Sequence, residues 1–152
     1  MSPTRAMVLA AGLGLRLRPI TENLPKPLVS VAGRSMLDRA LDHFDAYGVE
    51  SIAVNCHYLS GMIEEHLVAR NSPRIDIFRE EILLDTGGGV ANALSALGPD
   101  PFFVANADII WTDGACPALA RLAEFWRDDD MDALLLMHPI QQAVGYHGDG
   151  DF

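Results

Sequence analysis

The twenty residues LAAGLGLRLRPITENLPKPL, which begin at Leu9, gather positive charge around glycine and proline near the start of the chain. Gly12 and Gly14 fall in this stretch, and glycine lets backbone N–H groups come close to an anion. Arg16 and Lys26 add two cationic side chains, which supply the countercharge that a polyphosphate needs. We therefore expect an irregular loop that holds phosphate groups.

The charge of the 152-residue chain is distributed unevenly, with a net value of −10. Residues 1–39 contain six cationic and two acidic side chains, whereas the remainder contains five cationic and nineteen acidic ones. Lys26 is the only lysine, and it stands between two prolines. The acidic total argues against nucleic-acid and anionic-membrane partners. The local positive excess favours a small anionic ligand instead.

Composition narrows the class of protein further. About half of the residues are apolar and few are aromatic, which suits an α/β domain over residues 1–152. No apolar run reaches the roughly 18 residues of a membrane span, so we expect a cytoplasmic protein. Cys56 and Cys116 have no CxxC spacing, which argues against a disulfide framework or a zinc site.

A candidate metal ligand follows another apolar stretch, FFVANAD, which ends at Asp108. A triphosphate brings several negative charges, and hard carboxylate oxygens hold the cation that bridges them. Asp108 is therefore a candidate magnesium ligand, with a helix N-cap as the alternative role. Asn106 is expected to orient that carboxylate or to contact a nucleoside.

The Gly-x-Gly pair has a competing interpretation as a dinucleotide-binding turn. That fingerprint needs a third glycine three residues later, where this chain has Leu17, followed by Arg18 and Pro19. A nicotinamide-dependent oxidoreductase is therefore disfavoured. Arg18 is equally compatible with phosphate binding and with a solvated surface position.

Predicted strands and helices alternate along the chain. Strands are expected at 6–11, 51–55, 74–78, 101–105 and 133–137, and helices between Ser35 and Gly48, at 60–70, from about 90 to 97 and from about 117 to 126. Such alternation predicts a doubly wound, mostly parallel sheet that binds ligands beyond the carboxyl ends of its strands. Two segments, 9–14 and 106–108, fall at such ends. The tail VGYHGDGDF resembles half of a hairpin turning at Asp149-Gly150, so we expect the native chain to continue.

The stretch from Leu9 to Pro27 matches every fixed position of L-A-A-G-x-G-x-R-x-x-P-x-T-x-x-x-P-K-P. That pattern is the signature of the sugar-1-phosphate nucleotidylyltransferases, which this chain resembles. VAGRSMLDRALDHF, VNCHYL and NAD extend the resemblance over essentially the whole chain. The stretch LLDTGGGVANAL is most similar to the N-acetylmuramate-1-phosphate uridylyltransferases, in which it usually reads L-E-T-G-G-G. In this chain, Asp85 replaces the glutamate of that motif.

The resemblance implies a Rossmann-like transferase that joins a nucleoside triphosphate to a sugar-1-phosphate, with Mg²⁺ as cofactor and UTP plus N-acetylmuramate-1-phosphate as the expected substrates. It implies that Arg16 clamps the β and γ phosphates, that Lys26 acts at the reacting centre and that Asp108 holds the metal. The nucleotide-binding residues it implies are Leu9, Ala10, Ala11, Gly12, Gly14, Thr86, Gly87, Gly88 and Asn106.

Several alternatives stay open. Thr86 to Gly89 would approach the base and ribose, or would form only a flexible strand-to-helix turn. Asn55 and His57 would line the pocket, or His57 would be a structural histidine. The protein itself is an active transferase, for this or another sugar such as mannose or glucose, or a non-catalytic module that binds nucleotide sugars. The pattern leaves the base, the sugar, a second metal ligand and the oligomeric state open.

Overall fold

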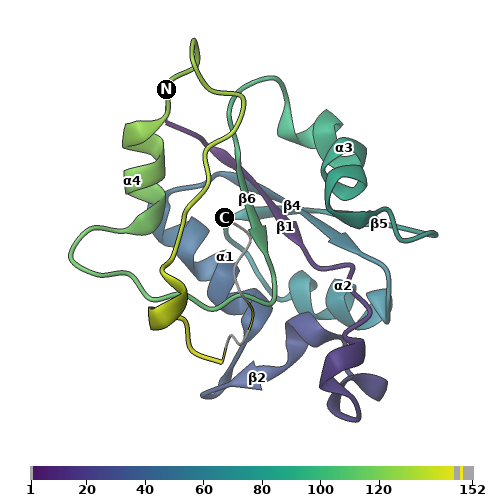
Figure 1. Ribbon diagram of the computed structural model, residues 1–152. Coiled ribbons are helices and arrows are strands. Elements are labelled where there is room, and N and C mark those ends of the chain that lie inside the picture. The colour runs from purple at the N-terminus through teal and green to yellow at the C-terminus, as the bar shows by residue number, and fades with distance from the viewer. Residues whose placement is uncertain (1, 146–147, 149–152) are drawn as a thin grey trace.

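The computed structural model describes residues 2–145 and 148, and four parallel strands form its sheet in the order β5-β4-β1-β6 (Figure 1). These strands are β1 (Arg5–Leu9), β4 (Ser51–Cys56), β5 (Arg74–Arg79) and β6 (Phe103–Asn106), while β2 (Ser30–Val31) and β3 (Arg34–Ser35) form an antiparallel ribbon. The helices are α1 (Met36–Tyr47), α2 (Ser60–Val68), α3 (Asp85–Leu97) and α4 (Ala118–Phe125), with 3-10 turns η1 (Leu15–Leu17), η2 (Ile20–Glu22), η3 (Lys26–Leu28) and η4 (Ile140–Gln142).

Helices cover both faces of the sheet, so the predicted doubly wound arrangement is confirmed (Figure 1). Ala6 and Val8 of β1 join the core formed with α1, α2 and α4. Met7, between them in sequence, joins the core formed with α3. This alternation follows from the two-residue period of a strand, and it makes β1 a buried central strand.

Local signals set the bounds of α1 as the sequence predicts. Ser35 is its N-cap, and the Ser35 hydroxyl oxygen accepts a hydrogen bond from the Asp38 N–H at 3.0 Å. Gly48 ends the helix with φ of 96°, a left-handed conformation that favours glycine. Among the described residues, no helix combines the length and the apolar character that crossing a bilayer requires.

The predicted glycine-rich turn before Val90 is wrong, because α3 already begins at Asp85. Gly89, Ala93 and Leu97 are buried and stand four residues apart, so they share the face of α3 that packs on the sheet. That packing outweighs the low helix propensity of glycine. Thr86 to Gly89 are therefore the first turns of a helix and not a flexible connection.

The predicted strand at 133–137 is also wrong. Leu135, Leu136 and Met137 are each more than half exposed, and their backbone belongs to neither sheet. A strand is stable only when a neighbouring strand satisfies its N–H and C=O groups. The apolar character of this segment was the only signal for a strand. The predicted turn at Asp149-Gly150 lies outside the described residues.

Candidate functional site

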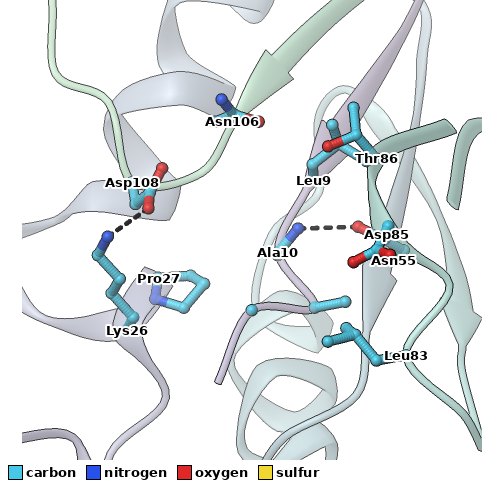
Figure 2. Close-up of a pocket in the computed structure, with 12 residues that line it drawn as sticks. Leu9, Ala10, Lys26, Pro27, Asn55, Leu83, Asp85, Thr86, Asn106 and Asp108 are labelled. Carbon is cyan, nitrogen blue, oxygen red and sulfur yellow. Dashed lines mark hydrogen bonds and ion pairs between the residues drawn. The ribbon is translucent and has the colours of Figure 1, made fainter. Parts of the chain in front are cut away.

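A cavity of about 260 Å³ lies at the carboxyl ends of β1, β4 and β6 (Figure 2). It is found where a doubly wound sheet is expected to bind its ligand. The residues that line it are Leu9, Ala10, Ala11, Gly12, Lys26, Pro27, Asn55, Leu83, Asp85, Thr86, Asn106 and Asp108.

One wall of the cavity is charged. Lys26 and Asp108 form an ion pair between Nζ and Oδ2, although 82 positions separate them in sequence (Figure 2). Their side chains are 22% and 35% exposed, so ligand oxygens have access to both charges. Ala107, next to Asp108, donates its N–H to the Leu9 carbonyl at 3.0 Å. The pairing of β1 and β6 thereby places Asp108 beside the end of β1.

The opposite wall is held by buried hydrogen bonds and is called here the anchored wall: Ala10, Asn55, Glu80 and Leu84. The Ala10 N–H donates to Asn55 Oδ1 at 2.8 Å, and Asn55 Nδ2 donates to Glu80 Oε1 at 2.8 Å. The other Glu80 oxygen accepts the Leu84 N–H at 3.0 Å. Asn55 and Glu80 are 2% and 4% exposed. Because an ionised carboxylate only accepts, Glu80 fixes which end of the Asn55 amide faces Ala10.

Two backbone features complete the anchored wall. A Cβ atom at Gly89 would lie 2.6 Å from Asn55 Nδ2 and 3.2 Å from Glu80 Oε1, so only glycine fits beside this pair. Asp85, which lines the cavity, has φ of 58°, a left-handed conformation that is uncommon for residues other than glycine. Backbone strain of this kind is concentrated at binding sites.

The structure brings together eight of the residues predicted for the site. Those lining the cavity are Leu9, Ala10, Ala11, Gly12, Lys26, Thr86, Asn106 and Asp108. Four others do not line it, namely Gly14, Arg16, Gly87 and Gly88. Arg16 is exposed in η1. Gly14 lies against Lys26, because a Cβ there would be 3.1 Å from that of Lys26.

The open alternatives at individual positions are settled by their contacts. Asn55 lines the cavity as predicted. His57 does not, and its Nδ1 lies 2.8 Å from the Glu80 carbonyl oxygen, a structural contact. Asp108 is not an N-cap, because α4 begins only at Ala118, whose N–H donates to Asp113 at 2.8 Å.

Sequence reasoning missed three residues that line the cavity, Pro27, Leu83 and Asp85, and the buried Glu80 behind it. The sequence could have indicated Asp85, because this residue departs from the pattern of the similar transferases. Pro27 belonged to the signature that located the loop. Leu83 and Glu80 carried no distinguishing pattern in the sequence.

The parallel sheet, with helices on both faces and a cavity beyond the carboxyl ends of its strands, places the chain in the class of doubly wound α/β domains. The family model described as nucleotidyl transferase matches residues 5–146. The chain therefore belongs to the nucleotidyl transferase family.

Two curated relatives illustrate the family. The chain is 44% identical to N-acetylmuramate alpha-1-phosphate uridylyltransferase of Caulobacter vibrioides, over 99% of this chain and 64% of that protein. It is 35% identical to mannose-1-phosphate guanylyltransferase of Mycobacterium tuberculosis, over 86% of this chain and 36% of that protein. The chain thus spans less than two thirds of the length of either relative.

Solved structures agree with the fold. HddC from Yersinia pseudotuberculosis, complexed with GMP-PN, matches with a TM-score of 0.62 and 30% identity, over 69% of this chain and 48% of that one. A UDP-glucose pyrophosphorylase complexed with UDP-glucose matches with a TM-score of 0.72 over 80% of this chain and 52% of that one. At 18% identity, the second likeness supports the fold alone.

Proposed function

We propose that this protein joins a nucleoside triphosphate to a sugar-1-phosphate and releases pyrophosphate. The observation that carries the proposal is the convergence of Lys26 and Asp108 at one strand-end cavity. A cation for phosphate oxygens and a hard carboxylate for a metal ion are the two charges that this reaction needs. Membership of the nucleotidyl transferase family supports the same conclusion.

The two walls suggest how the nucleotide lies. Its phosphates would face the charged wall, where Lys26 and Asp108 are half-exposed. Its base and ribose would then face Leu83 and Thr86 at the other side of the cavity, where an apolar side chain lies beside polar groups that can fix the orientation of a ligand. Ala10 lies between the two regions (Figure 2).

In the proposed reaction, an oxygen of the sugar phosphate attacks the α-phosphorus in line. The new P–O bond forms as the bond to the pyrophosphate oxygen breaks, so no nucleophile from the protein is needed. Lys26 would donate hydrogen bonds to the oxygens that gain negative charge in the transition state, and Arg16 would bind the departing phosphates. Catalysis then consists of positioning and charge stabilisation.

The residues present fit a magnesium ion. Mg²⁺ is usually bound by one or two carboxylates together with substrate phosphates, and Asp108 offers such a carboxylate in an accessible position. No group of three or more His, Cys, Asp or Glu side chains that could hold a metal occurs in the part of the chain that the structure describes. Asp108 would thus hold the ion together with the nucleotide, and the ion would neutralise phosphate charge.

For the substrates, we propose UTP and N-acetylmuramate-1-phosphate, used in cytoplasmic recycling of cell-wall sugars. Support comes from the 44% identity to a relative with that named activity. The 35% identity to a mannose-1-phosphate guanylyltransferase makes GTP with mannose-1-phosphate the second candidate. Retention of Lys26 and Asp108 favours an active transferase over a non-catalytic binding module.

Pyrophosphate release tests this proposal. The chain is assayed with UTP, GTP, CTP and ATP, each with N-acetylmuramate-, mannose- and glucose-1-phosphate, with and without Mg²⁺. We expect release only when a nucleotide, a sugar phosphate and Mg²⁺ are all present, and fastest with UTP and N-acetylmuramate-1-phosphate. Nucleotide binding without release from any pair would favour the binding module, and binding of NAD alone would favour the oxidoreductase.

A further inference from the structure

The segment that contains Arg16 and Lys26 is not stabilised by pairing with a β-strand. Residues 12–28, called here the basic loop, contain the 3-10 turns η1, η2 and η3 and belong to neither β-sheet of the described chain. A loop with so few backbone pairs needs other contacts to keep its charges in place. The positioning of Lys26 therefore depends on side chains around the loop.

Thr21, in the middle of the basic loop, is the first such contact. It is 1% exposed, and its hydroxyl donates to the Gly14 carbonyl at 2.7 Å. A Cβ at Gly14 would lie 3.1 Å from both Thr21 Cγ2 and Lys26 Cβ. Gly14, Thr21 and Lys26 are thus packed together, so a shift of Thr21 would move both the turn before Arg16 and the backbone of Lys26.

Tyr58 connects this packed group to the sheet. Its hydroxyl lies 2.8 Å from the Glu22 carbonyl oxygen and 3.1 Å from the Thr21 carbonyl oxygen, and it donates to these acceptors. Tyr58 follows β4 by two residues, and β4 is paired on both sides, with β1 and β5. The phenol therefore extends from a rigid strand end to the basic loop.

We propose that Tyr58 is a positioning residue for Lys26, acting through Thr21. The inference rests on the proposed function, in which Lys26 stabilises the transferring phosphoryl group. Tyr58 is not among the described residues that line the cavity, and its hydroxyl is hydrogen-bonded to the backbone of Thr21 and Glu22 and not to Lys26. We expect Tyr58 to affect turnover only because its hydroxyl keeps the basic loop in a fixed position relative to the ends of β1 and β4.

Removal of the hydroxyl alone tests the proposal. We expect Tyr58→Phe to lower kcat roughly three- to tenfold, the effect of one lost hydrogen bond in a positioned site. The matched control is Tyr47→Phe, because Tyr47 packs edge-on against Phe103, and its hydroxyl has no hydrogen bond to any described residue. Tyr47→Phe should leave kcat unchanged.

A double-mutant cycle shows whether Tyr58 acts through Lys26. Lys26→Ala should remain active enough to measure, and Tyr58→Phe should then cause no further loss of kcat in that background. An equal loss in both backgrounds would show an independent action and would overturn the proposal. If Lys26→Ala alone keeps full activity, the proposed role of Lys26 fails, which is a different result.

Limited trypsin digestion gives a readout that does not need turnover. Arg18 and Lys26 both precede proline, which blocks trypsin, so the bond after Arg16 is the cleavable one in the basic loop. Loss of the Tyr58 anchor should increase cleavage at Arg16 roughly three- to tenfold, while Tyr47→Phe should not. A cleavage rate unchanged in Tyr58→Phe, or a raised rate with normal kcat, would overturn the positioning role.

Discussion

The two walls of the cavity are built by different physical means. The anchored wall consists of a chain of hydrogen bonds centred on two almost fully buried side chains, Asn55 and Glu80. The charged wall consists of one ion pair, Lys26 with Asp108, whose side chains keep contact with solvent. A buried pair is costly to separate, whereas a half-exposed ion pair contributes little to stability.

This difference fits a division of labour in the proposed reaction. When the nucleotide binds, the ion pair must break, because Lys26 would then bind phosphate oxygens and Asp108 would bind the metal ion. A weak interaction between the two side chains makes this step easier. The anchored wall needs no exchange and can hold a fixed shape for the nucleoside. We therefore expect substitutions in the charged wall to change catalysis, and substitutions in the anchored wall to change stability and binding.

The largest effect should come from Asp108→Asn, which removes the charge but keeps the shape of the side chain. Because metal stabilisation of a phosphoryl group contributes several kcal/mol, we expect kcat to fall about a thousandfold. The remaining rate should no longer increase with Mg²⁺, measured as pyrophosphate release over a Mg²⁺ titration. A variant with full, Mg²⁺-stimulated activity would show that Asp108 does not hold the metal.

A smaller loss of catalysis is expected for Lys26→Ala. Removing one preorganised donor from a phosphoryl-transfer site should lower kcat about a hundredfold. The free energy of unfolding should change by less than about 1 kcal/mol, since the ion pair is half-exposed. Steady-state kinetics and urea unfolding of the same preparation check both parts. A large loss of stability with little change in kcat would contradict the expectation that the charged wall serves catalysis more than stability.

In the anchored wall, Gly89→Ala should act mainly on stability. Its Cβ would meet Asn55 Nδ2 at 2.6 Å, and such overpacking costs about 1–3 kcal/mol in the free energy of unfolding. The KM for the nucleotide should rise more than kcat falls. Gly87→Ala is the stability control, because nothing lies within 4 Å of its Cβ position. Equal denaturation midpoints for the two variants would contradict the packing.

The smallest perturbation uses the two cysteines as probes. Cys56 follows Asn55 and is buried, while Cys116 is exposed beyond Asp108. Burial, reinforced by the nearby Glu64 carboxylate, raises the pKa of the Cys56 thiol to about 11. At pH 8 only about one molecule in a thousand then carries the reactive thiolate.

Labelling of the folded protein with a thiol reagent at pH 8 should therefore modify Cys116 quickly and Cys56 very slowly. Labelling in guanidinium chloride should modify both at similar rates. Two equally fast thiols in the folded protein would show that the core between β4 and the helices α1 and α2, which contains Cys56, opens readily.

Spacing and local chemistry predicted much of this molecule. The alternation of strands and helices predicted the doubly wound sheet, and the adjacency of parallel strand ends explains why Asp108 lies beside the end of β1. Ser35 and Gly48 marked the bounds of α1 through cap geometry. In each case the signal is local, or it follows from the order of the strands.

The missed features depend on tertiary contacts. Glu80 stands in the polar stretch REE, which is typical of a surface. The register of β5 against β4 carries it inside, where its N–H donates to the Cys56 carbonyl at 2.8 Å. The early start of α3 depends on packing of Gly89 against the sheet, and the strand expected at 133–137 had no neighbouring edge to complete it.

The central place of β1 affects the order in which the molecule folds. β1 pairs on one side with β4, where Ala6 is aligned with Ile52, and on the other side with the more distant β6, where Ala6 is aligned with Phe103. Contacts between residues so distant in sequence form slowly, because closing the intervening chain costs entropy. On the ribosome, we therefore expect β1 to emerge first but to gain its second neighbouring strand only after β6 has been synthesised.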